Sequence, residues 1–297
     1  MLRAMYTSIT GLRNHQTMLD VVGNNIANVN TYGFKASNTA FKTLLTQTMQ
    51  GAGAPSPTLG GTNFQQVGLG MTIDSITQQF TQGALQTTGV GTDLAIQGDG
   101  FFMVTNDLAG VAAGAPEMFY TRAGNFKFDQ NGTLVTSDGY HVMGWVDSDA
   151  DPSNGLTFTT ADPLSSIVVD PTLMSDPIIG PDGSVSVIDR DPANTFGTLG
   201  QRITIGMLSF SRFSNSSGLE QVGNNRWQES LNSGVPVTDV SNTNGMGQLS
   251  VGYLEMSNVD LATEFTEMIK AQRGFQANSR VITTSDEILQ ELVNLKR

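Results

Sequence analysis

The chain has 297 residues, which is long enough for one large hydrophobic core or two modest ones. Its 27 acidic and 15 basic residues give a net charge of −12, so nucleic acid and anionic membrane surfaces would be repelled and are not expected as partners. Cysteine is absent, which excludes disulfides, thiolate metal sites and cysteine nucleophiles.

In residues 1–35 an apolar residue recurs at every seventh position, which is the spacing of a coiled-coil helix. The row consists of Met5, Leu12, Leu19 and Ile26, and Ile9 belongs to a second row between them. The pattern stops at residues 30–33, where Asn and Gly favour a helix end. The segment has no apolar run long enough for a signal-peptide core, and no later stretch approaches the roughly 20 apolar residues that span a bilayer. We therefore expect an N-terminal helix, no membrane insertion and, if the protein leaves the cell, export without a cleaved signal.

Residues 36–91 have a different character. The spacing of Phe41, Leu44 and Leu45 predicts a short helical continuation, after which the composition shifts to Gly, Ala, Pro, Thr and Gln. Such a composition cannot bury enough apolar surface to fold alone. We expect an extended linker that becomes ordered only against neighbouring chains.

Residues 92–252 show short alternating segments separated by turn dipeptides. Residues 126–129, 133–136 and 140–145 are separated by Asn131-Gly132 and Asp138-Gly139, which is the pattern of a β-meander. Further strands are predicted over residues 184–188 and 203–210. The simplest account is a single β-rich domain.

The last segment, residues 253–297, repeats the seven-residue pattern more strongly. Its first row is Leu261, Met268, Phe275, Ile282 and Leu289, and a second row, four residues on, begins with Phe265 and Gln272. Asn258 is predicted as the N-cap and Asp260 adds a favourable charge to the first turn. The pattern therefore predicts a helix from about Val259 to Leu295.

Two interpretations of these apolar rows stay open. The helices could bury them against each other or the central domain within one chain, or they could bury them between chains. The polar residues Gln272, Ser279 and Asp286 favour packing between chains, because they are costly in a dry core but can specify register between copies.

No catalytic constellation is expected. The two histidines, His15 and His141, lie in different predicted elements, so a catalytic triad is improbable. The segment from Asp147 begins like a calcium loop, but Pro152 and Phe158 occupy the positions that require Gly and a bidentate Glu. We expect no enzyme activity, no cofactor and no metal site.

Four strings of the sequence point to one family. Residues 19–35 read LDVVGNNIANVNTYGFK, residues 93–102 read DLAIQGDGFF, residues 120–126 read YTRAGNF, and residues 257–279 read SNVDLATEFTEMIKAQRGFQANS. In order and position they resemble the N-terminal signature, the β-domain entry, the second block and the C-terminal helix block of the axial proteins of the bacterial flagellum. The likeness covers both ends and much of the middle, and leaves about residues 147–200 without a specific match.

This resemblance implies a mainly β central domain with long N- and C-terminal helices that form a coiled-coil layer lining a hollow tube. It also implies a structural protein that is exported unfolded through the flagellar type III apparatus, lies outside the cell in the flagellum, and assembles with copies of itself into an open helical polymer. The expected heterologous partners are flagellar rod proteins, hook–filament junction proteins and the hook cap.

Within the family, the strings at residues 82–89 and 283–297 resemble those of the short hook proteins of Gram-positive-type bacteria. This resemblance implies the hook subunit, which forms a bendable tube that joins the rod to the filament and transmits torque. The distal rod subunit is the alternative, because the chain has little room for the additional outer domain that many hook proteins carry. A more remote alternative is a soluble β-domain binding module with helical oligomerisation arms, which predicts a pocket with convergent polar groups and a small closed oligomer.

The residues expected to make assembly contacts come from both ends of the chain. In the N-terminal segment they are Met5, Ile9, Leu12, Leu19, Asn24, Asn25, Ile26, Asn28, Gly33 and Phe34. In the C-terminal segment they are Leu261, Phe265, Met268, Gln272, Phe275, Ile282 and Leu289.

Overall fold

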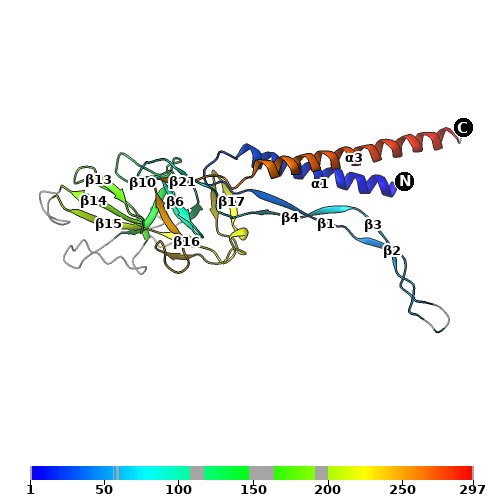
Figure 1. Cartoon of the computed structure of the whole chain (residues 1–297), viewed down its shortest axis with the longest axis horizontal. Helices are drawn as coiled ribbons and strands as arrows, with labels where there is room; N and C mark the ends of the chain where they lie inside the picture. The colour runs from blue at the N-terminus through cyan, green and yellow to red at the C-terminus, as the bar shows by residue number, and fades with distance from the viewer. Residues whose placement is uncertain are drawn as a thin grey trace. The chain divides into compact units, whose positions relative to one another are not determined.

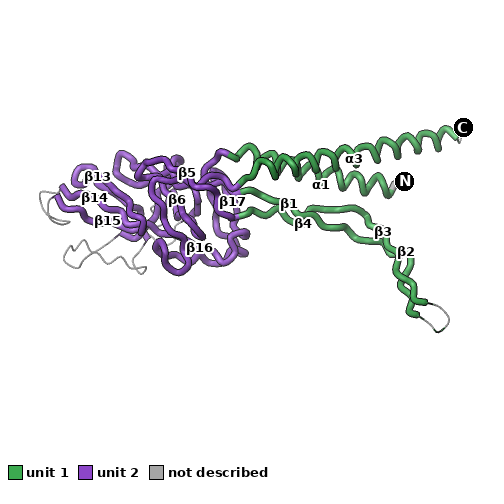
Figure 2. Tube along the Cα trace, viewed as in Figure 1, with its two compact units in different colours: residues 1–29, 36–79, 259–297 green, residues 30–35, 80–258 purple. Residues whose placement is uncertain are grey.

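The chain is divided into two compact units. A computed structural model describes residues 2–55, 57, 60–107, 117–146, 164–190 and 200–295. Unit 1 comprises residues 1–29, 36–79 and 259–297, and unit 2 comprises residues 30–35 and 80–258 (Figure 2). The chain therefore crosses from one unit to the other four times.

This grouping differs from the four segments expected from the sequence, which were residues 1–35, 36–91, 92–252 and 253–297. Residues 36–79 pack with the two helices, whereas residues 30–35 and 80–91 belong to the β-rich unit. The difference arises because the predicted linker makes regular backbone pairs of its own.

Unit 1 contains the two long helices, α1 (Leu2–Ala27) and α3 (Leu261–Asn294), drawn in Figure 1. Both helices were predicted, but α3 starts two residues later than expected. Asp260 is its N-cap, because the Asp260 carboxylate accepts hydrogen bonds from the Ala262 amide (3.0 Å) and the Thr263 hydroxyl (2.8 Å). The predicted cap, Asn258, instead donates its side-chain amide to Thr81 Oγ1 (2.8 Å) in unit 2.

Unit 1 also contains a long antiparallel β-hairpin. Its strands are β1 (Ser37–Thr43), β2 (Thr46–Gln50), β3 (Gln65–Gly68) and β4 (Met71–Gln78). β1 pairs with β4 and β2 pairs with β3. The helical continuation predicted around Phe41 is therefore wrong. The Thr-rich strands of this segment find backbone hydrogen-bond partners within the chain instead. That the segment becomes ordered only against neighbouring chains stays a prediction.

Unit 2 is built almost entirely from strands. They are β5 (Leu85–Thr87), β6 (Leu94–Gln97), β7 (Phe101–Thr105), β8 (Phe119–Thr121), β9 (Lys127–Phe128), β10 (Leu134–Val135), β11 (His141–Val146), β12 (Leu164–Ser166), β13 (Met174–Ile179), β14 (Ser184–Asp189), β15 (Arg202–Leu208), β16 (Phe210–Arg212), β17 (Glu220–Gly223), β18 (Arg226–Gln228), β19 (Val237–Asp239), β20 (Gln248–Val251) and β21 (Tyr253–Glu255). A short 3₁₀ turn, η2 (Ser216–Gly218), precedes β17.

The strands of unit 2 form one large antiparallel sheet and two small pairs. The main path of the large sheet runs β13-β14-β15-β11-β7-β8-β18-β17, while β6 pairs with β20 and β5 pairs with β21. The predicted meander is confirmed, since β9 pairs with β10 and β10 pairs with β11. The strands predicted near residues 184–188 and 203–210 are also present, as β14, β15 and the start of β16.

The hydrophobic core lies in unit 2. Phe102 is fully buried and makes ring contacts with Phe126 and Phe210, at centroid distances of 5.0 and 5.6 Å. A second cluster groups Phe101 and Trp227 with neighbouring aromatic residues. These large side chains come from strands far apart in sequence, so they tie the β-rich unit together.

Candidate assembly surfaces

The helices α1 and α3 pair through small and polar residues. Gly11 on α1 faces the Asn278 amide, and Gly274 on α3 faces the His15 ring. A Cβ atom on either glycine would lie 2.5 or 2.6 Å from the facing side chain, too close for any larger residue without movement. Because residue numbers rise on one helix as they fall on the other, the pair is antiparallel. This close approach accounts for Gly11 and Gly274 in the helix interiors despite the poor helix propensity of glycine.

Two buried asparagines of α1 connect the helix to the hairpin. Asn25 exchanges two hydrogen bonds with the Ser37 backbone: its Nδ2 donates to the Ser37 carbonyl (2.9 Å), and the Ser37 amide donates to Asn25 Oδ1 (3.0 Å). Asn25 Nδ2 also donates to Glu264 Oε1 on α3 (3.1 Å), and Asn14 Nδ2 donates to the Met71 carbonyl (2.7 Å). Partial burial raises the pKa of Glu264, while the hydrogen bond from Asn25 acts in the opposite direction. Polar contacts thus hold unit 1 together.

The apolar rows predicted from the sequence lie beside this polar face and are not fully buried by it. In α1 the partly buried members are Met5, Ile9, Leu12, Leu19 and Ile26. In α3 Met268, Ile282 and Leu289 are partly buried, and Leu261, Phe265, Gln272 and Phe275 are exposed. The exposed fractions of Phe265 (50%) and Phe275 (39%) are high for aromatic residues. Their role in assembly stays a prediction, but the side chains are available for it.

Other apolar side chains of unit 1 are exposed as well. On α3 they are Ile269, Val281, Ile288 and Leu292, and on the hairpin they are Leu45, Met49 and Phe64. Large exposed apolar surfaces on a folded protein mark sites of interaction. We call these residues, together with Leu261, Phe265 and Phe275, the exposed apolar set of unit 1.

The remaining predicted residues make contacts inside the subunit. Asn28 Nδ2 donates to the Asn24 carbonyl (3.0 Å) and to Asn24 Oδ1 (2.8 Å), which satisfies groups at the end of α1. Gly33 and the buried Phe34 lie in residues 30–35, which we call the strap. Gly33 has a φ of +69°, and a Cβ atom there would lie 2.7 Å from the Ala123 amide nitrogen.

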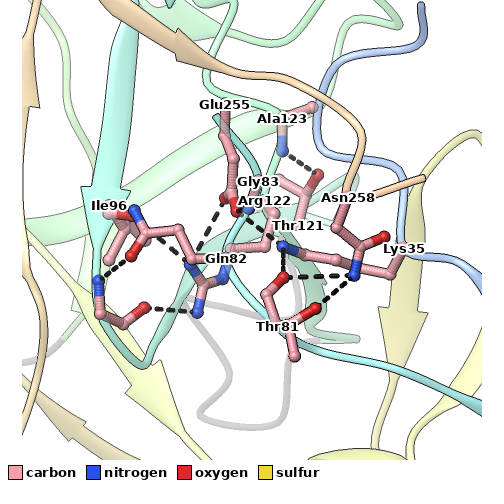
Figure 3. A network of polar contacts seen from close by, with 11 residues as sticks. Lys35, Thr81, Gln82, Gly83, Ile96, Thr121, Arg122, Ala123, Glu255 and Asn258 are labelled. Carbon is pink, nitrogen blue, oxygen red and sulfur yellow. Dashed lines mark hydrogen bonds and ion pairs between the residues drawn. The ribbon is translucent and has the colours of Figure 1, made fainter. Parts of the chain in front are cut away.

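The strap leads to a buried ion cluster in unit 2 (Figure 3). Lys35 Nζ donates to Glu255 Oε1 (2.6 Å) and to the Thr81 carbonyl (2.8 Å). Arg122 lies 3.4 Å from Glu255 Oε2, and the Gly83 amide donates to Glu255 Oε1 (2.9 Å). The side chains of Lys35 and Glu255 are fully buried, and that of Arg122 is 3% exposed. Two cations therefore share one carboxylate out of contact with solvent.

Burial governs the electrostatics of this cluster. It lowers the pKa of Lys35 and of Arg122, and the negative charge of Glu255 opposes the shift in both. Arg122 is further satisfied by the carbonyls of Gly98 (2.8 Å) and Ile96 (3.5 Å), and its guanidinium lies 5.3 Å from the centre of the Phe101 ring. Glu255 is therefore the group on which both cations depend.

The sequence did not identify this cluster as a unit. Lys35 and Arg122 each lie within a string that carries the family resemblance, but Glu255 lies two residues before the C-terminal string. The available signal was one Lys and one Arg, in two strings whose only other charged residue is Asp20. Their common partner becomes visible only when β21 pairs with β5 and brings Glu255 beside Gly83.

Among the described residues, no group of three or more His, Cys, Asp or Glu side chains is placed to hold a metal ion. His15 lies on α1 in unit 1 and His141 opens β11 in unit 2. The calcium-like segment from Asp147 lies outside the described residues. Neither helix in the described part of the chain is long and apolar enough to cross a membrane.

Three family profiles match the chain. They are "Flagella basal body rod protein" over residues 5–35, "Flagellar hook protein FlgE/F/G D1 domain" over residues 95–187, and "Flagellar basal body rod FlgEFG protein C-terminal" over residues 250–295. They cover the N-terminal helix with the strap, much of the large sheet, and α3 with the strands before it.

Known proteins match the chain along its whole length. It is 48% identical over 299 residues to the flagellar basal-body rod protein FlgG of Bacillus subtilis, with complete coverage of both chains. It is 37% identical to the protein of the same name from Buchnera aphidicola, covering 99% of this chain and all of the relative. The flagellar hook protein FlgE of Borreliella burgdorferi is 28% identical, in an alignment of 449 residues that covers both chains fully. An alignment so much longer than 297 residues means that this hook protein has segments that the present chain lacks.

Proposed function

The chain belongs to the family of flagellar basal-body rod and hook proteins, and on that premise we propose that it is a structural subunit of the distal rod. The observation that carries this proposal is the end-to-end identity of 48% with a basal-body rod protein of nearly equal length. The hook relative is 28% identical and much longer. The comparisons therefore favour the distal rod, the alternative from the sequence, over the hook subunit that was expected first. Since the family is one of flagellar structural proteins, no catalytic role is proposed.

We propose that the subunits assemble into an open helical polymer through unit 1. Polar and small residues make the closest contacts of α1 with α3 and with the hairpin. The exposed apolar set is therefore not buried within the described part of the subunit. Burying that set between copies would contribute about 25 cal/mol per Å² of apolar area, which offsets the cost of ordering the subunits. Contacts between different surfaces of identical copies do not close into a ring unless the rotation permits it, so they generate a helical tube.

The other expectations drawn from the resemblance belong to this proposal. The subunit would be exported unfolded through the type III apparatus without a cleaved signal, and it would lie outside the inner membrane with other axial proteins above and below it. The coiled-coil layer would form between copies, since within one chain the α1–α3 pair uses glycine and asparagine at its closest contacts.

The test is electron microscopy of the purified full-length protein at rising concentration and salt. Straight hollow tubes are expected from a rod subunit, whereas curved tubes would indicate a hook subunit. A small closed oligomer at every concentration at which the protein stays soluble would overturn the polymer and favour the binding-module alternative.

A further inference from the structure

The buried ion cluster joins chain segments that lie next to the crossings between the two units. Lys35 is the last residue before the chain leaves unit 2 for the hairpin, and Thr81 is the second residue after it returns. Asn258 is the last residue of unit 2 before the chain returns to unit 1. Its Nδ2 donates to Thr81 Oγ1 (2.8 Å) and to the Thr81 carbonyl (3.3 Å). Three of the four crossings therefore have their unit 2 ends bonded into one network.

We infer that Lys35, Glu255 and Arg122 are positioning residues that fix these chain ends to the core of unit 2. Nothing in the family relationship or in the proposed polymer requires such a role. It follows from the observation that one carboxylate accepts hydrogen bonds from the strap, from the segment after β4 and from the residue after β8. Mechanical load on the helices and the hairpin would then reach the β core through this cluster.

Backbone packing supports the same role. A Cβ atom on Gly83 would lie 2.0 Å from the Met256 carbonyl oxygen, and the Gly33 amide donates to the Glu255 carbonyl (2.8 Å). The strap, the segment after β4 and the end of β21 are thus in contact at the backbone as well as through charges. Such tight contacts restrict movement of the chain at the points where it enters and leaves unit 2.

The charges make the three residues unequal, and this gives the inference a specific test. Removing Lys35 leaves Glu255 paired with Arg122 and with the Gly83 amide, so the rest of the cluster stays satisfied. Removing the charge of Glu255 leaves two buried cations without their shared counter-ion, which is costly. Lys35→Met should therefore free the strap selectively, and Glu255→Gln should disturb the strap, the Gly83 segment and the fold of unit 2 together.

The experiment is hydrogen exchange of the full-length protein at a concentration that keeps it monomeric. In Lys35→Met we expect exchange in residues 30–35 to accelerate at least tenfold, while the Gly83 amide, which keeps its bond to Glu255, and β7 exchange at the wild-type rate. In Glu255→Gln we expect exchange of both the strap and the Gly83 amide to accelerate. Lys42→Met is the matched control, because it removes an exposed lysine paired with Asp74 (3.2 Å) in unit 1 and should leave the strap unchanged.

Unchanged exchange of the strap in Lys35→Met would overturn the inference. So would acceleration spread evenly over unit 2 in that variant, which would mean that Lys35 contributes only general stability. If Glu255→Gln does not fold, the Lys35→Met result decides alone.

One consequence rests on the proposed function: tubes of Lys35→Met should form, since unit 1 is intact, but should bend more than wild-type tubes in micrographs. Absence of tubes from the wild-type protein would overturn the proposed function without touching the exchange result. Equal stiffness of the two kinds of tube would show that the ion cluster does not transmit mechanical load to the β core.

Discussion

Unit 1 and unit 2 are stabilised in different ways. Unit 2 buries many large apolar side chains, most of them in a few clusters, and it buries both tryptophans of the chain. The described residues that unit 1 buries are mostly small or polar, such as Ser8, Asn14 and Asn25, while most of its large apolar side chains are partly buried or exposed. Because apolar burial is the main driving force of folding, unit 2 can supply its own stability, and we expect unit 1 to gain stability from contact with neighbouring copies.

The charges divide along the same boundary. Unit 1 carries eight basic and eight acidic residues, so the remaining seven basic and nineteen acidic residues lie in unit 2. The whole net charge of −12 therefore belongs to the β-rich unit. Copies of unit 1 can approach one another without net repulsion, whereas copies of unit 2 repel one another. We therefore expect attraction between copies to come from unit 1 and repulsion between copies to come from unit 2.

A charge placed in the exposed apolar set should impair assembly more than any other change considered below. Phe275→Asp should raise the concentration needed for assembly more than about a hundredfold, because an unpaired charge in a buried contact costs about 3 kcal/mol or more. The monomer should keep its helical circular dichroism, since Phe275 is already 39% exposed there. Sedimentation of polymer against total protein measures the effect.

The matched control is Gln276→Asp, which adds the same charge at the next, exposed position of α3. It should assemble far better than Phe275→Asp. If the two variants assemble equally well, or if neither differs from the wild type, α3 does not contribute Phe275 to a contact between copies.

A smaller effect separates the two units inside the monomer. Phe102→Ala empties a site in the core of unit 2 and should lower the free energy of unfolding by about 3–5 kcal/mol. Phe265→Ala, at a side chain that is 50% exposed, should cost less than about 1 kcal/mol. Urea unfolding can follow both, because tryptophan fluorescence reports unit 2 and helical circular dichroism reports unit 1. Equal losses would mean that Phe265 is packed within the monomer after all.

The sequence predicted the parts of the fold that depend on regular patterns. The seven-residue rows gave both helices, and the turns at Asn131-Gly132 and Asp138-Gly139 gave the meander. It failed at the hairpin, because the cross-strand pairing of Ser37 with Gln78 joins residues 41 apart and leaves no periodic apolar signal. It also placed the cap of α3 on Asn258 instead of Asp260, because both residue types are good caps and only the structure shows that Asn258 is bonded to Thr81.

The candidate sites divide in the same way. The apolar positions of the helices were predicted, since periodicity reports which face of a helix is apolar. The polar pairing of α1 with its neighbours was not predicted, because Gly11, Asn14 and Asn25 only interrupt the apolar pattern of the sequence. Their contacts, with Asn278, Met71 and Ser37 respectively, are visible only in the structure. Glu255 was missed for a related reason, since nothing in the local sequence distinguishes it from a solvated carboxylate until its partners are known.

A change of ionic strength tests the division of charge between the two units, and its effect on assembly should be the smallest. Raising the ionic strength from 0.01 to 0.1 M shortens the screening length from about 30 to about 10 Å, which weakens repulsion between copies of unit 2 more than contact between apolar side chains. The concentration needed for assembly should therefore fall several-fold. The double variant Asp138→Asn, Glu220→Gln removes two of the acidic charges of unit 2 and should shift the same curve to lower salt.

A rise in that concentration with salt would contradict the division of charge, because it would show that attraction between opposite charges drives assembly. The exposed arginines Arg13, Arg273 and Arg280 of unit 1 would then be the groups to examine, as partners for the carboxylates of unit 2 in another copy. Their replacement by glutamine would abolish the salt dependence in that case. If apolar contact in unit 1 and repulsion in unit 2 govern assembly, the same replacement would leave the sign of the dependence unchanged, since it gives unit 1 a negative charge and adds to the repulsion.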